Sequence, residues 1–169
     1  MLLSLLRDYT GLYAPVTLFV LSLFFLRNTS TFLHFFVVGF ILNNILNIIL
    51  KLFIKEPRPV DEQKNIEIGI VNGVRIGFDK FGMPSGHAQN CGFCLSFITL
   101  TLNNPFITGL YAIISTISLF QRYLYKNHTI LQLGIGLTIG LGQGYLTYLI
   151  GNKYITGNIK MKKDDGAPL

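Results

Sequence analysis

Apolar runs that are each about long enough to cross a bilayer recur along the chain, and they constrain its fold more than any other feature. They span residues 11–26, 31–53, 85–103, 106–120 and 129–150. The hydrocarbon core of a bilayer is about 30 Å thick and needs roughly 17 to 25 apolar residues as helix. The first and fourth runs are short and are expected to borrow residues at their ends. The sequence predicts an all-α, polytopic transmembrane helical bundle of about five spans.

The composition agrees with a membrane protein. Half of the 169 residues are hydrophobic, only 13% are charged, and the mean hydropathy is +0.49. A soluble domain carries about a quarter charged residues, so an ordinary cytosolic domain is not expected and a disordered chain is excluded. The net charge of +6 resides in connectors between apolar runs, which favours a lipid bilayer and an anionic ligand over nucleic acid as partners. Length predicts one membrane-embedded domain, residues 1–150, followed by a polar basic tail, residues 151–169.

The two ends of the chain predict its orientation. Residues 1–10 are apolar, carry Arg7 and Asp8 and are too short to span, which predicts a short interfacial helix; a cleaved signal peptide is the weaker alternative. Five spans place the termini on opposite sides. The tail contains four lysines, Lys153, Lys160, Lys162 and Lys163. The positive-inside rule therefore predicts a cytoplasmic tail, and places the connectors 54–83 and 121–128 on the extracytoplasmic or lumenal side.

The long connector contains a hairpin pattern around residues 66–78. Apolar and polar residues alternate over 66–71 and again over 74–78, and Asn72-Gly73 stands between them. Asn-Gly between alternating runs is a strong signal for a type I′ turn. A lone hairpin is marginal in water, so it must rest on the helices or the membrane. It would be a covering flap or a substrate-binding lid.

Polar residues within the second run define a helical stripe. Asn44, Asn47 and Lys51 share one face, and Arg58 follows seven residues after Lys51, where Pro57 and Pro59 end the helix. Ionisable residues in membrane segments are functional candidates. The alternative is a polar packing face with cations that extend to the membrane surface.

The start of the third run combines groups that suit an anion. The first N–H groups of a helix lack internal partners and, with the helix dipole, attract phosphate. Here they follow Pro84 and coincide with the Ser85 hydroxyl, with Gly86, which allows close approach, and with the proton donor His87. The alternative is an ordinary capped helix start.

The connector before the fifth run contains Arg122, Lys126 and His128. Gln132 follows His128 by one helical turn, so its amide oxygen is positioned to accept from the imidazole. Alone, His128 would be a structural histidine. However, all three clusters fall on the same predicted side of the membrane, which chance would not favour.

These three clusters resemble the three-part signature of the type 2 phosphatidic acid phosphatase and vanadium haloperoxidase superfamily. The matching residues, in order, are Lys51, Arg58, Pro59, Pro84, Ser85, Gly86, His87, Arg122 and His128. Two positions depart from the usual pattern: Gln121 replaces a serine and Gln132 replaces an aspartate. Glutamine at the second position is typical of the dolichyl diphosphatase-like branch, which the surrounding residues also resemble most.

The resemblance implies a role for each matching residue. His128 is expected to be the nucleophile that forms a phosphohistidine, and His87 the acid that protonates the leaving oxygen. The phosphate oxygens are expected to bind a group of five residues, Lys51, Arg58, Ser85, Gly86 and Arg122. Three cations supply charge stabilisation without a metal or another cofactor. Gln132 is expected to hold His128 in one tautomer.

The expected activity is hydrolysis of a lipid phosphate or diphosphate, with a polyprenyl diphosphate such as dolichyl diphosphate favoured and phosphatidate-type monophosphates as alternatives. Two other classes remain open: a catalytically silent lipid-headgroup binder, and a transporter component suggested by the polar run Asn43, Asn44 and Asn47. The presence of both His87 and His128 argues against them. In the fifth run, three glycines spaced by four, Gly136, Gly140 and Gly144, predict a close helix-packing face.

Overall fold

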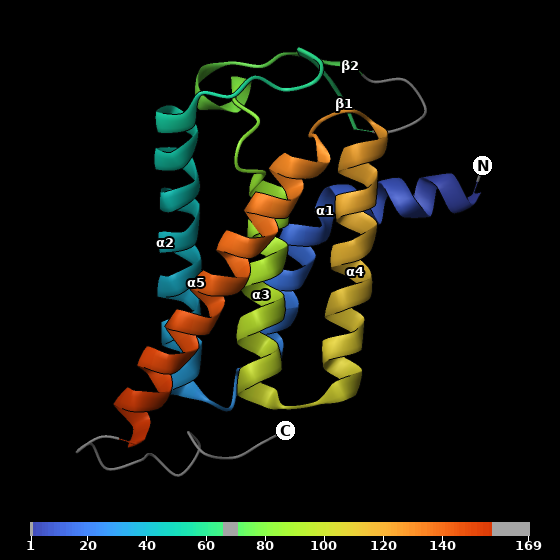
Figure 1. The fold of residues 1–169 in the computed structure, drawn as a ribbon. Helices are drawn as coiled ribbons and strands as arrows, with labels where there is room; N and C mark the ends of the chain where they lie inside the picture. The colour runs from blue at the N-terminus through green and yellow to red at the C-terminus, as the bar shows by residue number, and fades with distance from the viewer. Residues whose placement is uncertain (1, 66–70, 157–169) are drawn as a thin grey trace.

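The computed structural model describes residues 2–65 and 71–156, and within them five α-helices form an elongated bundle (Figure 1). The helices are α1 (Leu2–Phe25), α2 (Ser30–Ile54), α3 (Gly86–Leu102), α4 (Pro105–Leu124) and α5 (Ile130–Thr156). The start of α5 lies at the same end of the bundle as the long connector between α2 and α3, and the end of α5 lies at the opposite end. The predicted tail begins inside α5, which continues to Thr156.

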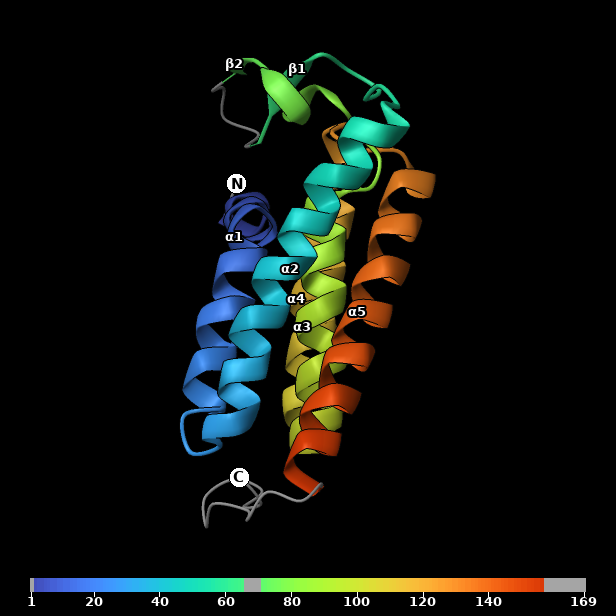
Figure 2. The same cartoon turned by 90° about the vertical axis from the view of Figure 1, so that its left-hand side faces the viewer.

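α3 occupies the centre of the bundle and contacts each of the other four helices (Figures 1 and 2). Its closest neighbour is α5, because the predicted glycine face of α5 packs directly on the α3 backbone. A β-carbon on Gly140 would lie 2.0 Å from the Gln89 carbonyl oxygen, and one on Gly144 would lie 2.6 Å from that of Phe93. The glycines therefore let two helices approach more closely than any side chain would permit.

This contact predicts that replacing either of two nearby glycines of α5 by alanine will change the stability of the protein by very different amounts. Gly140→Ala would force α5 away from α3, and overpacking of this kind costs about 1 to 3 kcal/mol. Gly142→Ala is the matched control, since a β-carbon there meets nothing within 4 Å. Thermal unfolding in detergent should show a lower midpoint for Gly140→Ala and a parent-like midpoint for Gly142→Ala. Equal midpoints would contradict the close α3–α5 packing.

The amide side chains of α2 pair with those of α3. Asn43 donates to Asn90 at 2.8 Å, Asn47 donates to Gln89 at 2.8 Å, and Asn90 donates to Asn44 at 3.0 Å. Buried amides are stable only when such partners are present. The polar run that suggested a transporter is thus a helix-packing ladder. Lys51, one turn further along the same helix, contacts the connector instead.

α1 bends, so that its first turns lie across the bundle and the remainder runs along it (Figure 1). Pro15 lies inside this helix and has no N–H to donate to the Gly11 carbonyl. That carbonyl accepts instead from the Ser118 hydroxyl of α4 at 2.8 Å. The separate N-terminal helix expected for residues 1–10 is therefore, from Leu2 onward, the first part of a continuous α1.

Three of the described helices are long and apolar enough to cross a membrane: Leu2–Phe25, Ser30–Ile54 and Ile130–Tyr154. α3 has only 17 residues and begins with a polar turn that contains His87, Gln89 and Asn90, which lowers its mean hydropathy. The prediction of five spans is therefore supported for three helices, and stays a prediction for α3 and α4.

The connector between α2 and α3 contains a two-stranded ladder, but not the predicted one. β1 (Glu62–Lys64) pairs antiparallel with β2 (Val71–Val74). The Asn72-Gly73 pair lies inside β2 rather than at a turn, and a 3₁₀ helix, η1 (Gly77–Lys80), begins inside the second expected strand. The predicted turn position is therefore wrong, and residues 66–70 of the first expected strand lie outside the described residues. The alternation of apolar and polar residues over 74–78 did not decide the pairing, because β2 pairs instead with Glu62–Lys64, a segment without a strand pattern in the sequence.

Candidate active site

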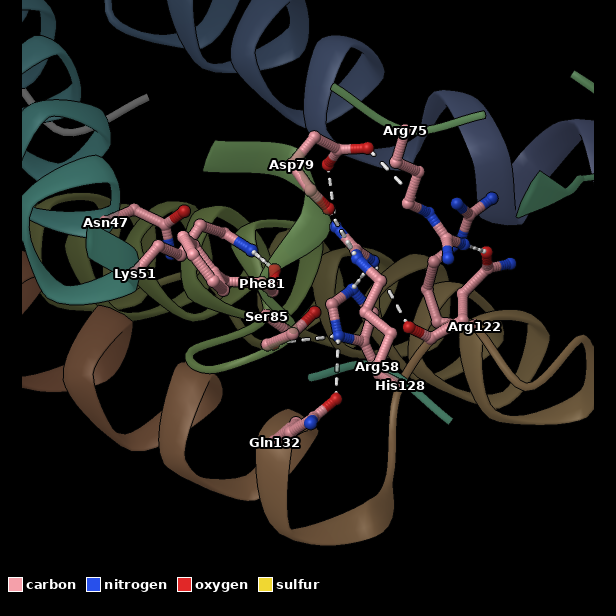
Figure 3. Close-up of polar contacts among 12 residues, drawn as sticks. Asn47, Lys51, Arg58, Arg75, Asp79, Phe81, Ser85, Arg122, His128 and Gln132 are labelled. Carbon is pink, nitrogen blue, oxygen red and sulfur yellow. Dashed lines mark hydrogen bonds and ion pairs between the residues drawn. The ribbon is translucent and has the colours of Figure 1, made fainter. Parts of the chain in front are cut away.

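The structure brings the predicted site residues together at one end of the bundle. They come from the end of α2, the start of α3, the end of α4 and the connector before α5, and the long connector covers them (Figures 1 and 3). α2 ends at Ile54, where Lys55 adopts a left-handed conformation with φ 54°. Arg58 therefore reaches the site from the connector and not from the helical face on which Lys51 lies.

His128 has a defined tautomer. Its Nδ1 lies 3.0 Å from the Gly82 carbonyl oxygen and 3.3 Å from Oε1 of Gln132, and its Nε2 lies 2.8 Å from Nη1 of Arg58. A guanidinium only donates hydrogen bonds, so Nε2 must accept with its lone pair. Nδ1 carries the hydrogen and donates to the two oxygens. The nitrogen that faces the cations is thus the one that carries the lone pair.

The surroundings of His128 keep its imidazole neutral. Burial lowers the pKa of His128 to about 2, and the positive charges of Arg58 and Lys51 act in the same direction. A side chain that is only 3% exposed cannot offset the loss of solvation by contact with water. The surroundings therefore favour the neutral imidazole, with its lone pair on Nε2, at neutral pH.

Gln132 serves both His128 and the start of α5. Its Oε1 accepts from the backbone N–H of Thr129 at 3.2 Å, while its own backbone N–H donates to the Thr129 hydroxyl at 3.1 Å. This reciprocal pair is a capping box. The Gln132 amide nitrogen donates to Oε1 of Glu56 at 2.8 Å and to the Pro57 carbonyl at 2.9 Å. The structure thus contains both orienting partners considered for His128, and the backbone carbonyl of Gly82 is the nearer one.

The contact between Gln132 and His128 predicts a pH effect. The double variant Glu56→Gln/Gln132→Glu swaps the two residue types. The hydrogen-bonded pair of an amide and a carboxylate is kept, but the carboxylate now lies beside His128. An adjacent negative charge favours the protonated imidazole and raises the pKa of His128. Protonated His128 has no lone pair, so the acid limb of the pH–rate profile should move to higher pH.

The single variant Glu56→Gln is the control for this experiment, because it removes the distal carboxylate and leaves the group beside His128 unchanged. Its acid limb should remain near that of the parent. A parent-like profile in a folded double variant would mean that Gln132 only caps α5 and that Gly82 alone orients the imidazole.

Three predicted phosphate ligands are cations held by the loops around His128. Lys51 is buried and donates to the Phe81 carbonyl at 2.6 Å. Arg58 donates to His128, to the Asn127 carbonyl and to the Asp79 carboxylate; burial lowers its pKa to about 10 although Asp79 opposes this, so it remains charged at neutral pH. Arg122 donates to Gln121 at 2.6 Å.

The start of α3 forms as predicted, but Ser85 and His87 have local partners. The Ser85 hydroxyl caps the helix by accepting from the Ala88 N–H at 3.4 Å. The backbone N–H of Ser85 donates to the Gln132 carbonyl at 3.1 Å. Nε2 of His87 lies 3.0 Å from the carbonyl oxygen of Leu12, next to the bend in α1. His87 also lies near enough to His128 for their charges to interact.

Sequence reasoning missed two residues that complete this cluster. Arg75, directly after β2, is 5% exposed and donates to the side chain of Asn127. Asp79 forms an ion pair with Arg58 at 2.7 Å. No spacing rule links these residues to the three motifs. The one available signal was an arginine within an otherwise alternating apolar stretch, and it was interpreted as part of a hairpin.

A pocket of about 550 Å³ opens beside His128. Its lining is mostly apolar and comes from the end of α4, the start of α5 and the connector: Pro59, Tyr123, Leu124, Ile130 and Leu131, with Lys126 and His128. An apolar recess beside a cationic cluster suits an amphipathic molecule with an anionic headgroup.

Comparison with known proteins agrees with this arrangement. The model of the PAP2 superfamily matches residues 32–155, which include all three motifs. The chain belongs to the PAP2 superfamily. Its three long apolar helices, together with this family, make it a membrane protein.

Two curated relatives are similar in sequence. The chain is 30% identical over 122 residues to the dolichyldiphosphatase of Saccharomyces cerevisiae, covering 66% of this chain and 48% of that protein. It is 29% identical over 170 residues to a palmitoyl-protein thioesterase-dolichyl pyrophosphate phosphatase fusion of Schizosaccharomyces pombe, covering 86% of this chain and 24% of that protein. The chain therefore spans about half or less of these relatives. No solved structure matches it significantly.

Proposed function

We propose that this chain is an integral membrane lipid phosphatase that hydrolyses a polyprenyl diphosphate, such as dolichyl diphosphate, through a phosphohistidine. The observation that carries this proposal is the lone pair on Nε2 of His128, which faces the cations and adjoins an apolar pocket. The PAP2 family match and the names of the two relatives support the same activity. The lipid chain would occupy the apolar pocket while the phosphates bind the cations.

The chemistry proceeds in two steps. Nε2 of His128 gives up its hydrogen bond from Arg58, which turns to the phosphate oxygens, and attacks the terminal phosphorus. A nitrogen–phosphorus bond forms, and the bond from this phosphorus to the bridging oxygen breaks. The electron pair leaves with the bridging oxygen on the lipid monophosphate, and His87 delivers a proton to it after exchanging its bond to Leu12. Water then attacks the phosphohistidine and gives a proton to His87, the nitrogen–phosphorus bond breaks with its electron pair returning to Nε2, inorganic phosphate departs and His128 returns to its neutral form.

The phosphoryl group moves from the bridging oxygen to Nε2 of His128 and then to the oxygen of water. In both steps it would be stabilised by three cations, Lys51, Arg58 and Arg122. Phosphoryl transfer depends mainly on positioning and on charge neutralisation, and preorganised cations in a buried site supply both. We propose the same five phosphate ligands as the sequence predicted, with Ser85 and Gly86 at the start of α3. We also propose that the site faces the extracytoplasmic or lumenal side.

The direct test of this function is phosphate release by the purified protein in detergent. A panel should contain a polyprenyl diphosphate, the matching polyprenyl monophosphate, phosphatidate and a soluble phosphate ester. The proposal expects the polyprenyl diphosphate to be the best substrate. Release from none of the four would overturn the lipid phosphatase assignment, and a preference for phosphatidate would move the assignment to lipid monophosphates.

Treatment with chelators and with vanadate gives a further prediction. Because three side-chain cations neutralise the phosphate, activity in excess EDTA should equal that of the untreated enzyme. Vanadate adopts the five-coordinate geometry of the transferring phosphoryl group, so it should inhibit competitively. An enzyme that loses activity in EDTA and regains it with Mg²⁺ would require a different phosphatase mechanism.

A further inference from the structure

Arg75 is a buried cation that lacks one hydrogen-bond acceptor. It follows β2 directly and is 5% exposed. Its Nη1 donates to the Val60 and Asp61 carbonyls, and its Nη2 donates to Oδ1 of Asn127. Its Nε is buried and has no hydrogen-bond partner among the described residues. A buried donor without an acceptor costs free energy, so this nitrogen is a candidate ligand for an anion.

Asp79 shows where such an anion would lie. One carboxylate oxygen of Asp79 is 2.7 Å from Nη2 of Arg58, and the other is 3.8 Å from Nε of Arg75. Figure 3 shows the carboxylate between these two arginines. Asp79 therefore occupies a position in which two linked anionic oxygens can contact both cations. Its side chain is 44% exposed and belongs to the short η1, so it can turn toward solvent when another anion arrives.

Arg122 supplies a second unpartnered nitrogen. It is 3% exposed, and its Nη2 is buried and has no hydrogen-bond partner in the described part of the chain. The charges of Arg58 and Arg75 both act on it. Burying like charges together is strongly unfavourable unless counter-charges are present. The negative charge of Asp61 interacts with Arg75, and that of Asp8, which is paired with Arg7, interacts with Arg122. Neither carboxylate accepts a hydrogen bond from the two free nitrogens.

We propose that Arg75 binds the second phosphate of a diphosphate ester, the one that is not transferred, and that the free nitrogen of Arg122 is shared between this phosphate and the transferred one. This inference rests on the proposed function and adds a binding site to it. The terminal phosphate would lie at His128 and Arg58, and the phosphate that bears the lipid would lie one bridging oxygen away, displacing Asp79 from Arg75. When the bridging bond breaks, its electron pair becomes negative charge on that second phosphate, which the two arginines neutralise.

The experiment compares two substrates with the same prenyl chain, a diphosphate and a monophosphate, in the variant Arg75→Gln. The ratio of kcat/KM for the diphosphate to that for the monophosphate should fall by about 10²- to 10³-fold, because one charged ligand of the leaving phosphate is lost. This ratio does not depend on the fraction of protein that folds. Arg75→Lys, which keeps the charge without the planar geometry, should give an intermediate ratio.

Lys80→Gln is the matched control, because Lys80 is an exposed cation of the same segment, adjacent to Asp79. Its ratio should equal that of the parent. An unchanged ratio in Arg75→Gln, or an equal fall in Lys80→Gln, would overturn the second-phosphate site. If the parent hydrolyses neither substrate, the proposed function itself fails, so the two failures are distinguishable.

A binding measurement covers the case in which Arg75→Gln is inactive on both substrates. Methylenediphosphonate and methylphosphonate should be compared as inhibitors of the parent and of Arg75→Lys, with the lipid monophosphate as reporter substrate. The parent should bind the diphosphonate at least about 10-fold more tightly, a difference of 1.4 kcal/mol, and Arg75→Lys should lose most of this preference. Equal inhibition of the parent by the two compounds would contradict the proposal.

Discussion

His128→Ala should abolish lipid phosphate hydrolysis, with a loss of roughly 10⁵- to 10⁶-fold, the size expected when a covalent nucleophile is removed. The physical reason is that the bond from Nδ1 to Gly82 fixes the tautomer of His128, so that the lone pair is on Nε2, beside Arg58. Alanine supplies no nucleophile, and water would have to attack the phosphorus directly. Phosphate release from a polyprenyl diphosphate measures the effect.

The matched control is His34→Ala. His34 is exposed, lies in the first turns of α2 at the far end of the bundle, and contacts the Ser30 carbonyl. Its loss should leave activity unchanged. A substrate with a radiolabelled terminal phosphate, quenched under basic conditions during turnover, should label the parent and the His34→Ala protein but not His128→Ala. Near-normal activity in His128→Ala would show that another group attacks the phosphorus.

Arg58→Ala should cause the second largest loss, about 10²- to 10³-fold in kcat/KM, as is typical when one preorganised donor to a transferring group is removed. Arg58 contacts Nε2 of His128, the Asn127 carbonyl and the Asp79 carboxylate at once. Arg58→Lys should recover only part of the loss, because an ammonium group cannot reproduce the planar fork that contacts three partners.

Arg27→Ala is the control for this series, since Arg27 is an exposed arginine of the α1–α2 connector at the opposite end of the bundle. Its activity should match that of the parent. Measuring kcat and KM separately is informative here, because removal of Arg58 should lower kcat as well as raise KM. A change in KM alone would indicate that Arg58 binds the ground state and the transition state equally.

The sequence predicted most of the helices and the residues of the three motifs, since both depend on local information. Apolar length determines where a chain must form helix in a bilayer, and the predicted run 31–53 differs from α2 by one residue at each end. The spacing of Gly136, Gly140 and Gly144 likewise predicted the close face on which α5 packs. Each of these features is set by residues near one another in the chain.

The connector between α2 and α3 could not be predicted in the same way. Asn72-Gly73 is a strong local turn signal, but in the structure it lies within β2, which pairs with Glu62–Lys64. A two-stranded ladder is too weak to fix its own register, so its position depends on what the connector contacts. Arg75 and Asn127 are such contacts, because they tie this segment to the loop that holds His128.

What the sequence by itself determined is the family, the bundle and the identity of the motif residues, since hydrophobic length and motif spacing are properties of the chain. What only the tertiary structure decided is the tautomer of His128, the double role of Gln132 and the presence of Arg75 and Asp79 among the cations. The physical reason is that a hydrogen bond or an ion pair is set by distance in space. Arg75 is 47 positions before Arg122 in the chain, yet burial brings both charges to one site where an anion must balance them.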